Sequence, residues 1–273
     1  MPIVSIIIPL FNGDKTIDRA IKSIIAQTYF TKSELIIVDD GSSDKSKNIA
    51  GSFAKTNRNI KLLHNRYNLG IAKTQNVGLE KARGRYIARL DQDDEWIDNK
   101  KLEKQVTILQ NNRDIGLVGT WAKVISEKGK DFNLEPAVYD QEIRSKILLA
   151  NMFIAPSVMF RRELLKKIGY YREDLIHGTE DYEYWLRIGT IMKFANIPDY
   201  CLKYNFSPKS HSYTNKANAT AEHLSIIKQY KKNYPHYTRA LIKNSIQYNL
   251  LKIKFLQKYY HLIVPRVAGR IYR

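Results

Sequence analysis

The stretch VSIIIPLFNGDKTIDRAIKSIIAQ, residues 4–27, decides the fold class of this chain of 273 residues. It begins with a short, mostly apolar and β-rich run at 4–9, which is typical of a strand buried on both faces of a sheet. Four isoleucines between positions 17 and 25 then recur at helical spacing, and Asp14 precedes them as the predicted N-cap. A buried strand that leads into an amphipathic helix is the first half of a βαβ unit.

The same alternation of strand and helix continues to residue 125. A helix is predicted at 70–82, and further strands are predicted at 34–40, 59–65, 85–91 and 114–125. Alternating elements of this kind predict an α/β fold, with a Rossmann-like and mostly parallel sheet that is flanked by helices.

Beyond residue 125 the pattern is less regular. Helices are predicted at 139–152 and at 177–189, the second of them capped by Thr179. Two short strands are predicted at 193–198 and 200–206. From about residue 214 onward, the spacing of apolar residues predicts a helical tail that is rich in Lys and Tyr.

The composition fits a globular protein with a substantial core, because 44% of the residues are hydrophobic. The single cysteine, Cys201, excludes an intramolecular disulfide and favours a reducing compartment. The apolar N-terminal run lacks the basic region and the small-residue cleavage site of a signal peptide, so we expect a strand there. No apolar run approaches the roughly 18 residues that a membrane-spanning helix needs.

The formal charge of +18 is concentrated in the C-terminal tail, residues 215–273. The tail holds twelve Lys or Arg and seven Tyr, but one acid, Glu222. A basic amphipathic helix of this kind is typical of a protein that lies on an anionic membrane surface. Two alternatives remain open: the tail packs on the core, or it mediates self-association into a homo-oligomer. We expect no nucleic-acid partner, because no recognition motif accompanies the charge.

Two acidic clusters follow predicted strands. Asp39 and Asp40 end the second strand, and the stretch ARLDQDDEW, residues 88–96, ends the fourth. Ligands of open α/β sheets bind at the carboxyl ends of the strands, so both clusters are candidate site residues. The first turn has neither the Gly-rich dinucleotide fingerprint nor a Walker sequence, which argues against NAD enzymes and P-loop NTPases.

Asp91 and Asp93 have the chemistry of a divalent-cation site. Two carboxylates on one turn share a hard cation readily and leave positions free for water and phosphate oxygens. The alternative is a structural cluster at the start of the following helix, neutralised by nearby Arg and Lys side chains such as Arg89. Glu95 is expected only to support the turn, and the role of Asp94 stays undecided.

Four motifs occur in order: VSIIIPLFN at 4–12, ELIIVDDGSSD at 34–44, NLGIAKTQNVGLEKARGRYIARLDQDD at 68–94, and TEDYEYWLRIG at 179–189. Together they closely resemble glycosyltransferase family 2, whose members have the GT-A fold and use nucleotide-sugar donors. The resemblance covers about residues 3–206. It implies a glycosyltransferase domain at 1–214 and a basic helical extension at 215–273. Within the domain, 1–125 would bind the nucleotide-sugar and 126–214 would carry the acceptor and catalytic part.

The resemblance implies roles on the donor side. Asp39 would accept a hydrogen bond from the base, and Asp40 would support the turn. Asp91 would approach the sugar and ribose hydroxyls, while Asp93, with Asp91 and possible help from Asp94, would hold Mn²⁺ or Mg²⁺. The other residues that would line the nucleotide pocket are Pro9, Phe11, Asn12, Asn68, Gly70 and Asn76.

The resemblance also implies that Asp181 is the catalytic base that takes the proton of the acceptor hydroxyl. Glu180 could carry that role instead, or both acids could simply favour the helix dipole. Trp185 is either a platform for a sugar or a core residue. His177 is a possible acceptor contact, whereas His64 is expected to be a structural imidazole.

The sequence departs from the family pattern after the Glu-Asp helix. Many members have a Tyr-Arg-x-His-Pro loop that closes over the donor phosphates, but here the run is YNFSPKSHS at 204–212. Asn205 and Ser207 therefore stand where Arg and His are expected. Lys209 or His211 would have to supply the missing positive contact to the diphosphate.

The resemblance predicts an inverting, metal-dependent hexosyl- or N-acetylhexosaminyltransferase that uses a UDP-sugar. The acceptor would be a glycan or a lipid-linked glycan in surface-polysaccharide or lipopolysaccharide synthesis, at the cytoplasmic face of a bacterial membrane. A sugar-nucleotide nucleotidyltransferase is the first alternative, but the turn PLFNGDKT lacks its Gly-rich, basic loop. A non-catalytic glycan- or membrane-binding protein is the second, and intact Asp91, Asp93 and Asp181 argue against it.

Overall fold

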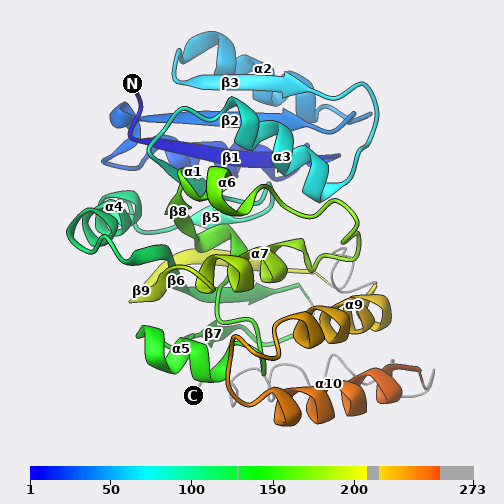
Figure 1. Ribbon diagram of the computed structural model, residues 1–273. Coiled ribbons are helices and arrows are strands. Elements are labelled where there is room, and N and C mark those ends of the chain that lie inside the picture. Colours follow the sequence, from blue (N-terminus) through cyan, green and yellow to red (C-terminus); the bar gives the residue numbers. More distant parts are fainter. Residues whose placement is uncertain (128, 208–214, 253–273) are drawn as a thin grey trace.

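The computed structural model describes residues 1–127, 129–207 and 215–252, and Figure 1 shows how their elements are arranged. Its centre is a nine-stranded sheet with the order β3-β2-β1-β4-β8-β6-β9-β5, to which β7 adds beside β6. The strands are β1 Val4–Leu10, β2 Ser33–Asp39, β3 Ile60–His64, β4 Tyr86–Arg89, β5 Glu95–Trp96, β6 Ile115–Ser126, β7 Phe132–Leu134, β8 Met159–Arg161 and β9 Lys193–Phe206.

Helices cover both faces of this sheet (Figure 1). They are α1 Ile17–Ile25, α2 Ser46–Thr56, α3 Ile71–Lys81, α4 Lys101–Asn111, α5 Asp140–Lys146, α6 Leu164–Ile168, α7 Glu180–Gly189, α9 Lys216–Gln229 and α10 Tyr237–Lys252, with 3-10 turns η1 Phe30–Lys32 and η2 Ala155–Ser157. Within the described residues, none of the helices is both long and apolar enough to cross a membrane.

The N-terminal half of the sheet follows the prediction closely. β3, β2, β1 and β4 are parallel neighbours. Apart from Ser5, whose buried hydroxyl donates to Glu34 at 2.7 Å, β1 is apolar because its alternate side chains enter two different cores: Ile6 and Ile8 pack with α1 and α4, whereas Ile7 packs with α3 and α7. A strand that is covered on both faces has no solvent-facing positions for polar residues.

The C-terminal half of the sheet differs from the mostly parallel arrangement that was predicted. β8 runs antiparallel to both β4 and β6, and β5 runs antiparallel to β9. The two late strands predicted at 193–198 and 200–206 form one continuous strand, β9, whose pairing with β6 shifts register near Trp121. The break that Pro198 and Asp199 suggested in the sequence is therefore absorbed as an irregularity of one strand.

Two predicted helix caps also differ in the structure. α1 begins at Ile17 with Thr16 as its N-cap residue, so Asp14 lies in the preceding turn. Thr179 does occupy the N-cap position of α7, but its hydroxyl donates to Glu222 of α9 at 2.7 Å and makes no capping bond within the described residues.

The described part of the C-terminal tail, α9 and α10, packs on the rest of the fold. Ile226 and Ile227 of α9 and Ala240 of α10 are buried in the same core cluster as α7. Between the helices, the Tyr234 hydroxyl donates to the carbonyl of Leu186 at 2.7 Å. The packing alternative thus holds for these two helices, and residues 253–273 lie outside the described part of the chain.

Candidate active site

The loops after β1 and β4 are joined at the carboxyl edge of the sheet. The Gln92 side chain accepts from the backbone N–H of Phe11 at 2.7 Å and donates to the Phe11 carbonyl at 3.0 Å. The Phe11 side chain remains exposed, whereas Pro9 is buried within β1. Asn12 has a φ of 48° and accepts from the backbone N–H of Ser43 through its side chain at 2.9 Å. These bonds fix a polar, accessible rim beside the strand ends.

Asp40 organises the loop after β3. Its carboxylate accepts from the Asn65 side chain at 2.8 Å and from the backbone N–H groups of Leu69 and Gly70 at 2.9 and 3.0 Å. Gly70 has a φ of 87°, a conformation that favours glycine, and a Cβ there would meet open space. Asn68 and Gly70 are both exposed, so this loop offers polar groups to a ligand.

Asp39 and His64 form a hydrogen-bonded pair at the ends of β2 and β3. The His64 Nδ1 lies 2.7 Å from an Asp39 carboxylate oxygen, and the other carboxylate oxygen accepts from the backbone N–H of Ser42 at 3.3 Å. The Asp39 side chain has 0% exposed area, compared with 40% for His64. The carboxylate to which the family resemblance assigned the nucleotide base is therefore buried and already hydrogen-bonded.

The turn at 91–94 gathers the acids of the second cluster. Asn205 of β9 holds this turn, because its backbone N–H donates to the Asp94 carboxylate at 2.8 Å and its side chain donates to the Asp93 carbonyl at 2.6 Å. Burial and the neighbouring Asp91 raise the pKa of Asp93 to about 6. Burial, with Asp93 and Asp91, raises the pKa of Asp94 well above its usual range.

The acids of this turn fit a divalent cation. One buried oxygen of Asp94 has no hydrogen-bond partner in the described part of the chain, and burial with neighbouring carboxylates raises the pKa values of Asp93 and Asp94. Hard oxygen ligands are those that Mg²⁺ and Mn²⁺ prefer. Among the described residues, however, no group of three or more His, Cys, Asp or Glu side chains is already arranged around one metal position. Substrate oxygens or water would therefore have to complete the coordination.

Arg89 connects this turn to the N-terminus of α7. Its Nε donates to the Asp91 carboxylate at 3.0 Å, and its Nη1 lies 3.6 Å from the Glu180 carboxylate. With the Gln75 amide turned so that its oxygen faces the guanidinium, that oxygen accepts from Nε at 2.7 Å. The Arg89 side chain is almost completely buried, so its charge is held between the two acidic groups.

Glu180 and Asp181 stand at the start of α7. Glu180 is buried, and burial with the adjacent Asp181 raises its pKa above the usual range. Asp181 is partly exposed, and burial raises its pKa too, although the charge of Arg89 opposes the rise. Asp181 is therefore the less buried residue of the pair, and burial increases the affinity of its carboxylate for a proton.

Residues 5–169 match the family model described as Glycosyl transferase family 2. The chain belongs to glycosyltransferase family 2. It is 32% identical over 242 residues to an uncharacterized glycosyltransferase of Methanocaldococcus jannaschii, a match that covers 87% of this chain and 78% of the relative. It is 36% identical over 218 residues to the Escherichia coli UDP-Glc:alpha-D-GlcNAc-diphosphoundecaprenol beta-1,3-glucosyltransferase WfgD, with 77% and 79% covered.

Solved structures confirm the GT-A fold of this glycosyltransferase. Staphylococcus aureus TarS 1–349 in complex with UDP-GlcNAc superposes with a TM-score of 0.68 at 19% identity, covering 95% of this chain and 75% of TarS. The mannosyltransferase PcManGT of Pyrobaculum calidifontis, in complex with GDP-Man and Mn²⁺, superposes with a TM-score of 0.66 at 18% identity, covering 98% and 82%.

Two residues that were predicted to face ligands make contacts inside the protein in this glycosyltransferase. Asn76 is buried, and its amide bonds both the backbone N–H and the carbonyl of Tyr171 at 3.0 Å, so it anchors the loop before α7. Trp185 has no exposed surface and lies among aromatic rings that include Phe153 and Tyr171. It is a core residue and not a platform for a sugar.

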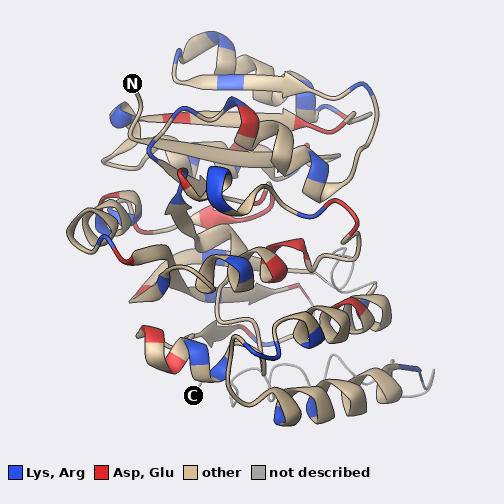
Figure 2. Cartoon of the chain, viewed as in Figure 1, with Lys and Arg blue, Asp and Glu red and all other residues tan. Residues whose placement is uncertain are grey.

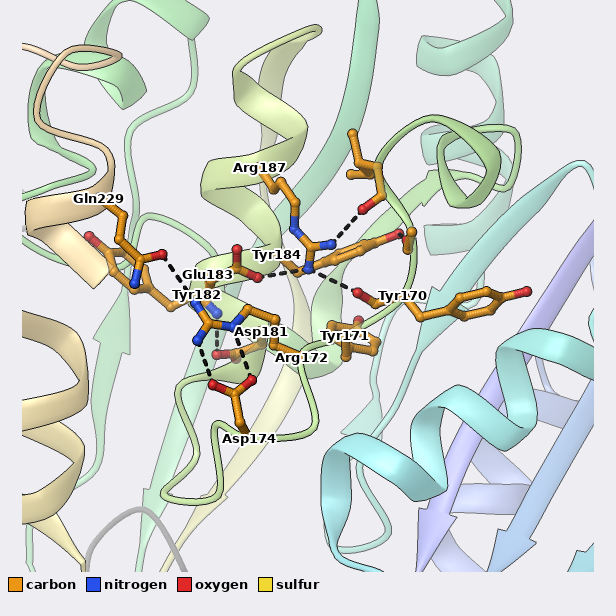
Figure 3. A network of polar contacts seen from close by, with 12 residues as sticks. Tyr170, Tyr171, Arg172, Asp174, Asp181, Tyr182, Glu183, Tyr184, Arg187 and Gln229 are labelled. Atoms are coloured by element: carbon orange, nitrogen blue, oxygen red, sulfur yellow. Dashed lines mark hydrogen bonds and ion pairs between the residues drawn. The ribbon is translucent and has the colours of Figure 1, made fainter. Parts of the chain in front are cut away.

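The loop before α7 is fixed by arginines of the helix and of the loop itself (Figure 3). Arg187 donates to the carbonyls of Ile168 and Tyr170 at 2.5 and 2.9 Å, and Arg172 pairs with Asp174. On the other side of the loop, Glu222 of α9 accepts from the backbone N–H of His177 at 3.3 Å. Loop and helix therefore form one braced unit around Asp181.

The remaining predicted contacts to the acceptor or the phosphates are His177, Lys209 and His211. The His177 side chain is partly exposed near Asp181 and lies 3.8 Å from Glu222, so it can still meet an acceptor. Lys209 and His211, the proposed phosphate contacts, lie outside the described residues. Asn205 contributes no positive charge to this site; it holds the acidic turn instead.

Sequence reasoning missed the connecting roles of Arg89 and Gln92. Arg89 was expected only as one of several neutralising cations, yet an Arg inside the apolar strand run RYIARLD was a signal that it would be buried with partners. Gln92 gave no comparable signal, because its bonds to Phe11 depend on β1 and β4 being neighbours.

Proposed function

We propose that the protein transfers a sugar, with inversion, from a UDP-sugar to a hydroxyl group of a lipid-linked glycan. The observation that carries this proposal is the bridge made by Arg89, which contacts Asp91 at the donor edge and Glu180 beside Asp181. The buried guanidinium of Arg89 thus fixes the distance between Asp91 and the helix terminus that carries Asp181. Such an arrangement suits a single displacement at one carbon.

In this mechanism Asp181 removes the proton of the acceptor hydroxyl as its oxygen attacks the anomeric carbon. Its partial exposure gives an acceptor access, and its raised pKa favours proton transfer near neutral pH. Glu180 is buried against Arg89, so it serves to orient the helix terminus and the guanidinium. One accessible carboxylate on the acceptor side fits inversion, because no second nucleophile is required.

Asp91 and Asp93 would hold Mn²⁺ or Mg²⁺ in the proposed reaction. A bound divalent cation supplies charge neutralisation for the diphosphate that leaves. Asn205 would keep the turn that presents these carboxylates in place. The hard oxygen donors and the raised pKa of Asp93 support this assignment, as does the Mn²⁺ named with the structurally similar PcManGT.

The donor and acceptor classes are inferred from relatives. WfgD is named for a UDP-Glc donor and a diphosphoundecaprenol-linked acceptor, and TarS binds UDP-GlcNAc. Transfer of a hexosyl or N-acetylhexosaminyl group agrees with both names, and we infer from the lipid-linked acceptor of WfgD a role in surface-polysaccharide synthesis. A lipid-linked acceptor would place the reaction at a membrane surface.

The test of the base is Asp181→Asn. We expect the variant to bind UDP with Mn²⁺ as the wild type does but to lose transfer by roughly 10²–10⁴-fold, because general-base catalysis contributes that much. Isothermal calorimetry and sugar transfer to a lipid-linked acceptor measure the two effects. Asp174→Asn, which changes an exposed carboxylate of the adjacent loop, is the matched control. Full activity of Asp181→Asn would remove Asp181 from the base role.

We further propose that α10 contacts an anionic membrane. Ile242, Ile246 and Leu250 are spaced four residues apart, and each is about half exposed, with values of 56%, 55% and 47%. Figure 2 shows basic residues and no acidic ones along α10; Arg239 and Lys252 are exposed, whereas the Lys243 ammonium donates to the carbonyl of Leu149 at 2.6 Å. Exposed apolar side chains among cations are typical of helices that lie at a lipid interface.

The membrane contact is tested by changing Ile242, Ile246 and Leu250 together to Gln. All three are exposed, so the fold should persist, and sedimentation with vesicles containing anionic phospholipid should fall several-fold. Vesicles of neutral phospholipid provide the lipid control. Unchanged sedimentation of the triple variant would exclude this face of α10 as the contact.

A further inference from the structure

Three consecutive residues of α3 have buried polar side chains, although the helix also contributes apolar residues to the core. Thr74, Gln75 and Asn76 have exposed fractions of 1%, 1% and 7%. Successive residues of a helix point about 100° apart, so these side chains reach in different directions. Buried polar groups in folded proteins have hydrogen-bond partners. The three residues therefore indicate that α3 holds several different parts of the fold.

The contacts of Thr74 and Gln75 lie on the donor side of the site. The Thr74 hydroxyl accepts from the Asn65 side chain at 3.3 Å. The same Asn65 amide donates to Asp40, which holds the donor loop, residues 65–70. Gln75 faces the Arg89 guanidinium, which in turn bonds the acids after β4. Both residues therefore support parts of the proposed donor site.

Asn76 instead contacts the acceptor loop, residues 169–179 between α6 and α7, which passes beside α3 in Figure 1. Its Oδ1 accepts from the backbone N–H of Tyr171, and its Nδ2 donates to the carbonyl of the same residue, both at 3.0 Å. Nδ2 also donates to the Glu173 carboxylate at 3.1 Å. One side-chain amide thus satisfies both backbone groups of Tyr171, as a neighbouring strand would.

Tyr171 joins this contact to the helix that carries the candidate base. It is 3% exposed, and its ring centroid lies 4.6 Å from that of Tyr184 and 6.3 Å from that of Trp185, both in α7. Without Asn76, the N–H and the carbonyl of Tyr171 would lose the partner that they have in the fold, which favours opening of the loop to water. Asn76 therefore fixes the acceptor loop against α7.

The acceptor loop also presents side chains beside Asp181. Ile176 is 61% exposed and His177 is partly exposed, and both precede Asp181 by no more than five residues. Tyr170, at the other end of the loop, is 40% exposed. Aromatic and aliphatic side chains with a few polar groups are typical of ligand sites. A substrate whose hydroxyl reaches Asp181 would have these side chains within reach.

We propose that Asn76 is a positioning residue for acceptor binding. By fixing the backbone of Tyr171, it holds the acceptor loop in the conformation in which the acceptor meets Asp181. This inference rests on the proposed transfer reaction and adds a residue of α3 to the support of the acceptor side. Thr74 and Asn76, two residues apart on one helix, then serve opposite sides of the reaction.

The first measurement is amide hydrogen exchange of the full chain, followed by mass spectrometry. Asn76→Leu removes both bonds to Tyr171, so peptides covering 169–179 should exchange roughly ten- to a hundredfold faster than in the wild type. Thr74→Val, the matched change of nearly equal shape, should leave these peptides unchanged and speed exchange at 65–70 instead. Asn76→Asp still accepts from the Tyr171 N–H and should lie between the wild type and Asn76→Leu.

The second measurement separates the two substrates, with UDP-Glc as donor and α-D-GlcNAc-diphosphoundecaprenol as acceptor, the pair for which WfgD is named. For Asn76→Leu we expect the acceptor KM to rise about tenfold, while kcat and the affinity for UDP with Mn²⁺ stay within about threefold. For Thr74→Val we expect several-fold weaker binding of UDP and an unchanged acceptor KM. Circular dichroism verifies that the variants are folded, and Asn76→Asp decides in the same way if Asn76→Leu is not.

The two variants distinguish positioning from simple support of the fold. If Asn76→Leu and Thr74→Val change the donor and acceptor constants alike, the side chains only support the fold, and the inference is overturned. An unchanged acceptor KM in Asn76→Leu overturns it as well, but leaves the glycosyltransferase proposal standing because the wild type still transfers. A wild type that transfers no glucose to this acceptor contradicts the proposed function, and the inference fails with it.

Discussion

The two acidic pairs of the site are neutralised in different ways. Glu180 and Asp181 lie beside the buried guanidinium of Arg89, so the protein supplies their cation itself. The Asp94 carboxylate accepts from the backbone N–H of Asn205, but burial and the charge of Asp91 raise the pKa of Asp93, and burial with Asp93 and Asp91 raises that of Asp94. The first pair has a cation within the folded chain, although burial still raises both of its pKa values, and the second pair would gain from a divalent cation in the proposed reaction.

The comparison is tested most strongly by Arg89→Met. Removing the cation leaves Asp91 and Glu180 facing one another without compensation, which should destabilise the fold by about 3–5 kcal/mol and abolish transfer. Urea unfolding measures the stability. Adding Glu180→Gln to Arg89→Met should recover part of the loss, because it removes one of the stranded charges. A loss below about 1 kcal/mol would mean that Arg89 does not neutralise this pair.

In the presence of EDTA, Asp93→Asn is expected to increase the stability of the fold, whereas Arg89→Met decreases it. The folded state raises the pKa of Asp93 to about 6, so it holds a proton more tightly than the unfolded chain, and stability is lost as pH rises from about 4 to 6. Neutralising the side chain should therefore stabilise the fold by about 1–3 kcal/mol at pH 7.5 and by less at pH 4.5.

Thermal unfolding in EDTA measures the stabilisation by Asp93→Asn, and thermal unfolding with Mn²⁺ measures how strongly the ion stabilises each protein. Mn²⁺ should stabilise the wild type and have less effect on Asp93→Asn, because ligands that bind only the native state raise its stability. Asp174→Asn is the control, since Arg172 lowers the pKa of that carboxylate and its loss should not stabilise. A variant at Asp93 that is no more stable than the wild type in EDTA would contradict the raised pKa of Asp93.

The smallest effect is expected for Asn205→Ala. The substitution removes the bond from the side chain to the Asp93 carbonyl but keeps the backbone bond to Asp94. We expect a loss of about 0.5–1.5 kcal/mol in stability and a several-fold weaker affinity for UDP with Mn²⁺. Calorimetry and urea unfolding measure both. If the affinity is unchanged, the acidic turn is held without this amide.

The parts of the fold that sequence predicted best are those with local causes. The apolar run of β1 and the spaced isoleucines of α1 depend only on neighbouring residues, and both elements lie where they were expected. The direction of β8 and the continuity of β9 depend on pairings with distant strands. Periodicity within a strand contains no information about which neighbour it will have or how that neighbour runs.

The site shows the same division. The acids at strand ends could be predicted as site residues because ligands of open α/β sheets bind at the carboxyl ends of the strands. In the structure, Asp91 and Glu180 lie on either side of Arg89. The burial of Asp39 beside His64 was not recognisable, since it depends on the register between β2 and β3. The roles of Asn76 and Asn205 as anchors likewise depend on contacts more than 90 residues apart in sequence.

The hydrogen bonds from the start of α7 to Glu222 of α9 have a consequence for the order in which the protein folds. Glu222 of α9 accepts from the Thr179 hydroxyl and from the backbone N–H groups of Ile176 and His177, just before the candidate base. During synthesis a chain emerges from its N-terminus, and the parallel strands can form before α9 exists. A nascent chain that ends before residue 222 has its donor edge but lacks this support for Asp181. The parallel strands of the proposed donor edge can therefore form before the support for Asp181 is complete.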